Sequence, residues 1–113
     1  MKAKLNVTAL QIPLFWENAG KNRAYIDRHF DQLNPAADII LLPELFSSGF
    51  TMNSHLVSES MNGITIQWMQ SWAAQWDVLL GGSLVIEEEG KCLNRFVVVG
   101  PNGPVALYDK RHT

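Results

Sequence analysis

Four consecutive apolar residues, Ile39 to Leu42, constrain the fold of this chain more than any other feature. A strand with one face in water alternates apolar and polar side chains, whereas a run without alternation is typical of a strand covered on both faces in a parallel sheet. Parallel strands need a long crossover connection, which is usually a helix. The residues around this run therefore decide whether a strand–helix–strand unit is present.

The residues before the run complete such a unit. Apolar residues alternate with polar ones from Leu5 to Ala9, which predicts a half-buried strand that ends near Pro13. Residues 17–33 carry apolar side chains three or four positions apart, as one face of an amphipathic helix requires, and Pro35 ends that helix. The apolar face of this helix consists of Tyr25, Ile26, Phe30 and Leu33. We therefore expect a βαβ unit.

A loop and a second helix are predicted next. Serine, glycine and asparagine are frequent in residues 46–63, which indicates a loop, and an amphipathic helix follows at 65–76. Its apolar side consists of Ile64, Trp68, Met69, Trp72, Ala73 and Trp76. Three tryptophans at helical spacing are typical of a core, and a stacking platform for a base or a sugar is the alternative.

A meander of strands is expected after the second helix. The predicted elements are strands at 78–86, 91–100 and 105–109 and turns at 87–90 and 101–104. The acidic triplet Glu87–Glu89 falls on the first turn without other oxygen ligands nearby, so we expect a hairpin tip and not a cation site. The resulting fold class is α/β, with a mixed sheet and two main helices.

Composition excludes several classes of protein. The 113 residues are 47% hydrophobic with a net charge of −2, which indicates one globular domain and gives no basic surface for nucleic acid. A single cysteine excludes an internal disulfide framework, and no apolar run approaches the roughly 20 residues of a membrane helix. The first ten residues lack the apolar core of a signal peptide. We expect a cytoplasmic protein without nucleic-acid or membrane partners.

Glu44 is the first candidate for chemistry. It follows the apolar run and Pro43, so it projects at the carboxyl end of a parallel strand, where open α/β folds bind their ligands. Partial desolvation at that edge would suit a general base. A structural carboxylate that caps a turn or pairs with a lysine is the alternative.

Lys110 and His112 close the last predicted strand. A lysine there can stabilise a developing oxyanion, and an ordinary solvated lysine is the alternative. His112 can be a base, a hydrogen-bond anchor or a surface residue. Cys92 is the only thiol, and no histidine lies near it in the sequence to activate it, which favours a structural cysteine. Gly81-Gly82-Ser83 lacks the context of a phosphate loop and indicates a glycine bend within a strand.

The order of these segments along the chain resembles one family. The matching segments are Asp38–Phe50 (DIILLPELFSSGF), Gly81-Gly82-Ser83, Asn94-Arg95-Phe96, the turn Pro101-Asn102-Gly103 and Tyr108–His112 (YDKRH). In this order they resemble the nitrilase superfamily of carbon-nitrogen hydrolases, and within it the bacterial omega-amidase branch. The resemblance extends from the first strand to the end of the chain.

The resemblance implies a fold, a reaction and two site residues. The family's fold is an α-β-β-α sandwich, usually oligomeric, and its Glu-Lys-Cys triad works without metal or organic cofactor. By motif match Glu44 is the general base and Lys110 stabilises the oxyanion, while a small ω-amide is hydrolysed to acid and ammonia through a cysteine thioester. Homo-oligomers are expected.

The nucleophilic cysteine of the triad matches no residue of this sequence by motif. The family's nucleophilic cysteine follows the catalytic lysine, whereas Cys92 precedes Lys110, so the role is not transferred to it. We expect the chain to be the N-terminal part of a longer hydrolase domain, inactive alone, with an apolar sheet face that promotes association. Two alternatives stay open: a non-catalytic α/β module that binds a ligand or partner through the 46–63 loop, and another specificity of the superfamily, such as carbamoylase or nitrilase.

Overall fold

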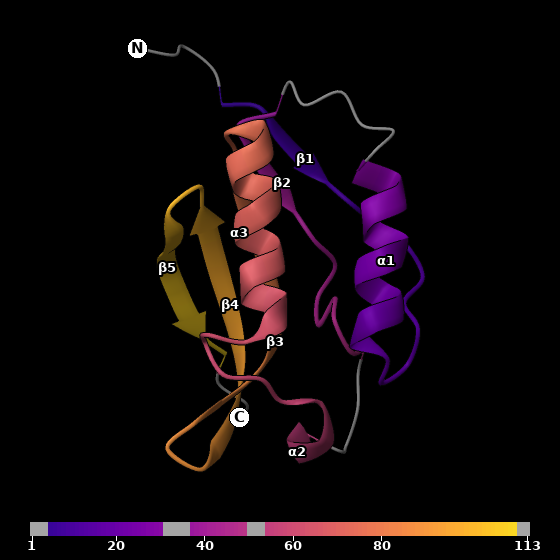
Figure 1. The fold of residues 1–113 in the computed structure, drawn as a ribbon, viewed down its shortest axis with the longest axis vertical. Helices are drawn as coiled ribbons and strands as arrows, with labels where there is room; N and C mark the ends of the chain where they lie inside the picture. The colour runs from indigo at the N-terminus through magenta and orange to yellow at the C-terminus, as the bar shows by residue number, and fades with distance from the viewer. Residues whose placement is uncertain (1–4, 31–36, 50–53, 111–113) are drawn as a thin grey trace.

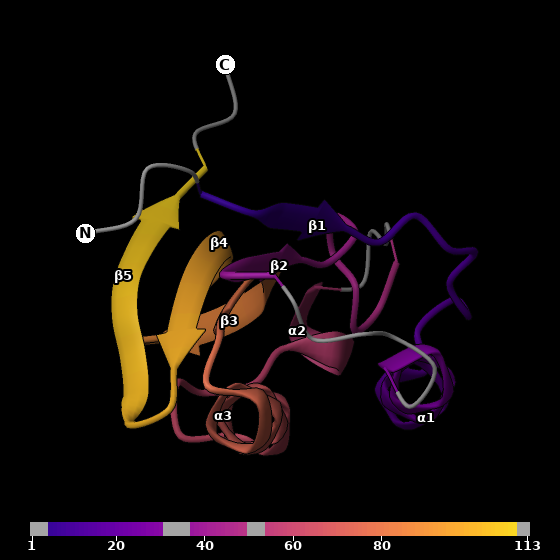
Figure 2. The same ribbon diagram turned by 90° about the horizontal axis from the view of Figure 1, so that it is seen from above.

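The structure is a computed structural model that describes residues 5–30, 37–49 and 54–110. These residues form a five-stranded mixed sheet with helices on one face (Figures 1 and 2). The elements are β1 (Val7–Ala9), α1 (Ala19–Phe30), β2 (Ile39–Leu41), α2 (Ser54–Val57), α3 (Ile64–Trp76), β3 (Leu79–Glu88), β4 (Lys91–Gly100) and β5 (Gly103–Asp109). The mixed α/β architecture is the one that the sequence predicts.

The strands follow one another across the sheet in chain order, from β1 to β5. β1, β2 and β3 are parallel, with Thr8 opposite Ile40 and Ile40 opposite Leu80, whereas β4 and β5 return antiparallel. Helix α1 connects β1 to β2, so the predicted βαβ unit is confirmed. The antiparallel strands are connected by turns at Glu89–Gly90 and Pro101–Asn102, inside the predicted turns 87–90 and 101–104, and the other residues of the predicted turns belong to β3 and β5.

Both long helices pack against the same face of the sheet, and none of the described helices lies on the other face (Figure 2). This arrangement contradicts two predictions from the sequence, that β2 is covered on both faces and that the apolar side chains of the first strand are buried. Ile40 is 1% exposed, but its neighbours Ile39 and Leu41 are half-buried, so β2 is covered fully on one face only. Leu5 and Val7 are 64% and 51% exposed, because the apolar side chains at the start of the chain lie away from the helices.

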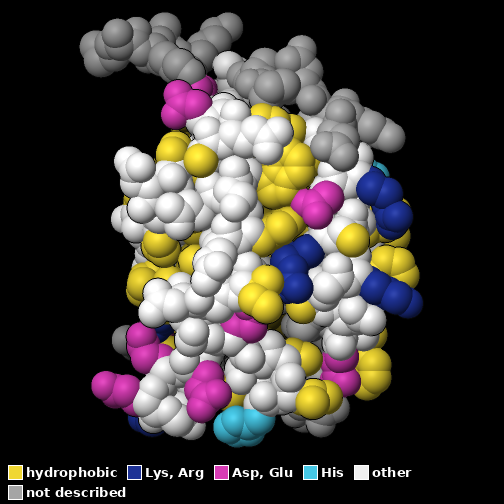
Figure 3. All heavy atoms as spheres, in the orientation of Figure 1, with side chains coloured by type: hydrophobic (Ala, Val, Ile, Leu, Met, Phe, Trp, Pro, Cys, Tyr) yellow, Lys and Arg dark blue, Asp and Glu magenta, His cyan; other side chains and the backbone are white. Residues whose placement is uncertain are grey.

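The core lies between the sheet and the two long helices. Its fully buried members come from both layers and include Ile26, Phe30, Ile40, Phe46, Met69, Leu80, Leu84, Ile86, Val97 and Val99. Hydrophobic side chains remain visible between α1 and α3 on the helical face (Figure 3).

The tryptophans of α3 belong to this core and do not form a platform. Trp68, Trp72 and Trp76 are half-buried, and their rings pack around the fully buried ring of Phe30 at centroid distances of 6.1, 4.9 and 5.2 Å. The indole N–H groups of Trp68 and Trp72 both donate to Oδ1 of Asp27 on α1 at 2.7 Å. The core interpretation of this helix is confirmed.

The helices begin and end close to the predicted bounds. Helix α1 begins two residues later than predicted, after Asn18, whose side chain accepts the Lys21 N–H at 3.0 Å as an N-cap. The positions of Leu33 and Pro35 lie outside the described residues. Ile64 is 66% exposed and Thr65 is buried, so the predicted apolar side of α3 is wrong at its first position.

Candidate active site

Glu44 stands just after β2 in a turn that is hydrogen-bonded to β3. The Leu42 N–H donates to the Gly81 carbonyl at 2.7 Å, and the Leu45 N–H donates to the Ser83 hydroxyl at 2.8 Å. Leu45 has a φ of +48°, a left-handed conformation that costs about 1 to 3 kcal/mol. The bonds to β3 offset this cost, so the sheet fixes the backbone of Glu44.

Lys110 directly follows β5 and meets Glu44. The Lys110 N–H donates to the Asn94 carbonyl at 2.9 Å. The Nζ ammonium donates to Oε1 of Glu44 at 2.6 Å, across 66 residues of sequence. The side chains of Lys110 and Glu44 are 33% and 46% exposed, so the expected desolvation of the carboxylate is not found. An exposed ion pair of this kind contributes about 1 kcal/mol or less to stability.

The register of β4 and β5 places this pair on the face without helices. Phe96 lies opposite Tyr108, and Arg95 lies opposite Asp109, so Lys110 continues the register opposite Asn94. Side chains alternate between faces along a strand, and Asn94 therefore shares a face with Phe96 and not with the core. The Oδ1 atom of Asn94 is buried without a hydrogen-bond partner among the described residues.

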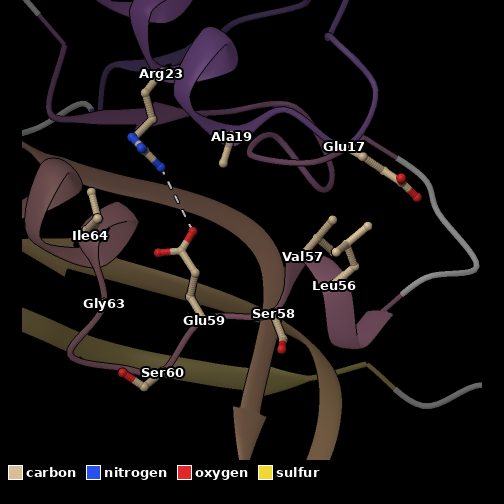
Figure 4. A pocket seen from close by; sticks show the side chains of 10 residues that line it. All are labelled: Glu17, Ala19, Arg23, Leu56, Val57, Ser58, Glu59, Ser60, Gly63 and Ile64. Atoms are coloured by element: carbon tan, nitrogen blue, oxygen red, sulfur yellow. Dashed lines mark ion pairs between the residues drawn. The ribbon is translucent and has the colours of Figure 1, made fainter.

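A cavity of about 460 Å³ lies apart from this pair, on the helical side of the sheet (Figure 4). Arg23 of α1 and Glu59 point toward one another across it, with Nη1 and Oε2 3.9 Å apart. Glu59 also accepts the Thr65 N–H at 2.8 Å, and Arg23 donates to the Thr65 hydroxyl at 2.8 Å. These contacts fasten α1 and the 58–60 segment to the start of α3, a structural role that the sequence does not indicate.

A second cavity, of about 630 Å³, borders Glu44 itself. It is lined by residues 9–13, which end β1 and follow it, and by residues 41–44, which end β2 and form the turn after it. Most of the lining side chains are apolar. The carboxyl ends of two neighbouring parallel strands thus form a hollow beside the candidate base, as open α/β folds commonly do.

Arg95, part of the Asn94-Arg95-Phe96 motif, has a role that the sequence does not predict. Its side chain is 4% exposed, and its guanidinium donates to Asp109 at 2.6 and 3.1 Å and to Glu88 at 2.8 and 3.4 Å. The hydrogen bonds from Arg95 lower the pKa of Asp109 and of Glu88, and these carboxylates raise the pKa of Arg95. Glu88 is therefore an ion-pair partner and not only a hairpin tip.

Cys92 is joined to a histidine that is distant in sequence. Its Sγ atom lies 3.4 Å from Nδ1 of His55 on α2, a short helix within the predicted loop. The sequence gives no signal for this contact, because 37 residues separate the partners. The structure thus joins Glu44 with Lys110 and Cys92 with His55. His112 lies outside the described residues.

The glycine pair of β3 lies within a strand, as the sequence predicts, and does not form a phosphate loop. Gly81 and Gly82 are buried within the strand, and a Cβ on Gly81 would lie 2.9 Å from a side-chain atom of Leu41. Small residues are needed here because neighbouring side chains approach the strand closely.

Two further properties bear on function. Within the described ranges no group of three or more His, Cys, Asp or Glu side chains is placed to bind a metal ion. None of the helices in the described parts of the chain has the length and apolar character needed to cross a membrane.

Sequence comparisons agree with the geometry. The profile of the family described as carbon-nitrogen hydrolase matches residues 6–113. The omega-amidase YafV of Escherichia coli K12 is 38% identical over 108 residues, and that of Yersinia enterocolitica is 39% identical over 113 residues. Each match covers 96% of this chain and 41% of the relative, so the chain spans about two fifths of the length of these curated relatives.

Structural comparisons show the same fold. XC1258 from Xanthomonas campestris, a CN-hydrolase superfamily protein with an arsenic adduct in its active site, superposes with a TM-score of 0.88 at 31% identity. That match covers 96% of this chain and 41% of the other. Nit3 from Saccharomyces cerevisiae, a member of the nitrilase superfamily, superposes with a TM-score of 0.74 at 20% identity and covers 96% of this chain and 44% of the other.

Proposed function

Because this chain belongs to the carbon-nitrogen hydrolase family, we propose that it supplies the general base and the oxyanion-stabilising lysine of a cytoplasmic amidase. The substrate is a small ω-amide, which the complete active site hydrolyses to acid and ammonia. One observation carries the proposal: the 2.6 Å contact between the ammonium of Lys110 and the carboxylate of Glu44. A base and a cation side by side are what acyl transfer to a thiol requires.

The two residues have different tasks in this reaction. Glu44 takes the proton of a cysteine thiol, the thiolate attacks the amide carbon, and Lys110 stabilises the negative charge that develops on the carbonyl oxygen. The C–N bond then breaks, and ammonia leaves with the proton that Glu44 held. Water, activated by Glu44, hydrolyses the thioester and releases the acid.

The nucleophile of this reaction is proposed to be a cysteine other than Cys92. The described contacts of Cys92 support this, because its thiol meets His55 and not Glu44. We therefore expect the 113-residue chain alone to release no ammonia from succinamate or from a glutamine-derived keto amide. Turnover by the chain that Cys92→Ala abolishes would overturn this assignment.

The relatives and the hollow beside Glu44 support the substrate class. Two relatives at 38% and 39% identity are omega-amidases. The 630 Å³ cavity beside Glu44 has the size of a small-molecule site and a mainly apolar lining, which suits the short carbon chain of an ω-amide. A carbamoylase or nitrilase specificity predicts release from an N-carbamoyl amino acid or an aliphatic nitrile instead, so these compounds belong in the assay.

A chimera tests the proposal directly. Residues 6–113 replace the matching segment of the Escherichia coli relative, and ammonia release from succinamate is measured. We expect activity in the chimera and a loss of roughly a hundredfold or more in kcat for Glu44→Gln and for Lys110→Met. Glu89→Gln, on the exposed tip of the β3–β4 hairpin, is the matched control and keeps full activity. A folded chimera in which Glu44→Gln is fully active would contradict the proposal.

A further inference from the structure

Arg95 is a buried charged residue that has no role in the proposed reaction. It is 3% exposed, and no other charged residue in the described ranges is buried. A buried guanidinium is costly unless it is paired and hydrogen-bonded. Two carboxylates, Asp109 and Glu88, meet this need from opposite directions, one at the end of β5 and one at the end of β3.

The contact with Asp109 is the tighter of the two. Nε donates to Oδ1 at 2.6 Å and Nη2 donates to Oδ2 at 3.1 Å, so both oxygens of one carboxylate are held by one guanidinium. Such a two-bond contact fixes the orientation of the carboxylate as well as its distance. Asp109 immediately precedes Lys110, and the Lys110 N–H is bonded to the Asn94 carbonyl. Two adjacent residues of β4 thus hold two adjacent residues at the end of β5.

In the described residues, the end of β5 is held by its pairing with β4 on one side. Among the described strands, β5 is the last of the sheet and pairs with β4 alone. Tyr108 and Leu107, just before Asp109, are 64% and 52% exposed. Segments with few buried contacts open easily, and a side chain that acts on a substrate must keep its position to within about 0.5 Å.

We propose that Arg95 is a positioning residue: it binds Asp109 and thereby holds the ammonium of Lys110 against Glu44. The inference rests on the proposed function of the Glu44–Lys110 pair. Glu88 has a different task, because it binds the same guanidinium from the β3–β4 hairpin and is not adjacent to Lys110. The two carboxylates, 51% and 40% exposed for Glu88 and Asp109, therefore form a matched pair for a test.

The test measures how fast an N-hydroxysuccinimide ester acylates Lys110 in the full 113-residue chain, with the modified peptides quantified by mass spectrometry. The contact with Glu44 protects the amine, so Glu44→Gln is expected to raise the rate about threefold, the factor that a part-exposed ion pair provides. Asp109→Asn and Arg95→Lys are each expected to raise the acylation rate of Lys110 about as much as Glu44→Gln does. Glu88→Gln is expected to leave the rate within about 1.5-fold of the original.

A double variant and two internal reference lysines show whether a change in the acylation rate of Lys110 comes from the loss of its contact with Glu44. Asp109→Asn combined with Glu44→Gln is expected to add nothing to Glu44→Gln alone, because both changes remove the same protection. Lys21 on α1 and Lys91 at the start of β4 are exposed and are labelled in the same sample, so unchanged rates there show that the reagent acts equally on every variant. The circular dichroism spectrum shows that each variant is folded. If Arg95→Lys does not fold, the comparison of Asp109→Asn with Glu88→Gln still decides.

The outcomes separate the two proposals. If Glu44→Gln leaves the Lys110 rate unchanged, the ion pair is absent and the proposed function loses its support. If Glu44→Gln raises the rate but Asp109→Asn does not, Arg95 is not a positioning residue and the proposed function stands. Equal effects of Asp109→Asn and Glu88→Gln overturn the inference too, because they assign Arg95 a general structural role.

Discussion

At the scale of single residues, Gly82 is a position where close packing leaves no room for a side chain. It lies in the middle of β3, and a Cβ there would approach two ring atoms of Phe46 to 2.9 Å and the Cβ of Leu42 to 3.2 Å. Phe46 is fully buried, so its ring cannot move into solvent. Gly82 therefore allows the turn that carries Glu44 to lie directly on the sheet.

Gly82→Ala is expected to lower the free energy of unfolding by about 1 to 3 kcal/mol, because overpacking in a core costs that much. Urea unfolding followed by tryptophan fluorescence measures it. Gly20→Ala, on α1 with only distant contacts near 4 Å, is the matched control and should be neutral or stabilising. A Gly82→Ala protein as stable as the original would show that the turn can move away from β3.

The Arg95–Asp109 contact gives a pH dependence whose sign follows from its cause. Hydrogen bonds from Arg95 lower the pKa of Asp109 in the folded state. A lowered folded pKa adds stability above the unfolded value, near 3.9, and this stability is lost as pH falls through the folded pKa. The stability difference between the original protein and Asp109→Asn is therefore expected to be largest above about pH 5.

Urea unfolding at a series of pH values measures this difference, and it should shrink steadily below about pH 4. Asp77→Asn serves as the control, because Asp77 is exposed at the end of α3 and adopts a left-handed conformation that asparagine tolerates. A difference for Asp109→Asn that stays constant between neutral and acidic pH would mean that the carboxylate is not held by Arg95.

At the scale of elements, one carboxylate fastens α1 to α3. Oδ1 of Asp27 accepts hydrogen bonds from the indole N–H groups of both Trp68 and Trp72, each at 2.7 Å. The two donors are on half-buried side chains, so their water is partly removed when the helices pack. A single oxygen thus satisfies two donors at the contact between the helices.

Asp27→Leu is expected to destabilise the fold by about 1 to 3 kcal/mol, because it leaves these donors without an acceptor. Asp27→Asn keeps one carbonyl oxygen and is expected to cost less. Thermal unfolding followed by circular dichroism at 222 nm distinguishes the two. Equal stability of Asp27→Leu and the original protein would show that water replaces the carboxylate at both indoles.

The elements also show what the sequence can and cannot predict. The bounds of α3 and of the β3–β4–β5 meander follow from local spacing and turn residues, and the structure confirms them to within a few positions. The covered face of β1 could not be predicted, since alternation identifies two faces without saying which one the helices cover. The sequence indicates Glu44 and Lys110 as candidates one by one, but it does not predict their contact, which spans 66 residues and depends on strand order and register.

The sequence does not predict the contact partners of Arg95 and Cys92, for the same reason. Arg95 meets Asp109 because β4 and β5 pair in one particular register, and a shift by one residue would turn it to the other face. His55 reaches Cys92 from a four-residue helix inside a segment that composition indicates as loop. Helices this short give no periodicity to detect.

At the scale of the whole molecule, the bare sheet face is the most distinctive surface. Figure 2 shows both long helices on the other side. Val7 on β1 and Tyr108 on β5 are 51% and 64% exposed, and Phe96 and Val98 between them are half-buried. Exposed apolar faces of a sheet promote association. We therefore propose that the protein forms homo-oligomers through this face.

Replacing Val7 and Tyr108 by lysine together is expected to lower the weight-average mass of the protein in solution toward that of a 12.7 kDa monomer. Sedimentation equilibrium over a range of concentrations measures this mass. Ala24→Lys, at an exposed position of α1 on the helical side, is the control and should leave the mass unchanged. A monomeric original protein, or an oligomer that the double variant does not affect, would contradict association through the bare face.

The division of the sheet into a parallel and an antiparallel part has a consequence for how the chain folds. β3, β4 and β5 are joined by two-residue turns and pair locally, whereas β1, β2 and β3 pair only after helical crossovers close. Local pairings form faster than those that need a long loop to close. Lys110 and the residues that hold it thus belong to the part that assembles early, and Glu44 to the part that assembles late. The two groups of the candidate site meet only when the slowest contacts of the chain have formed.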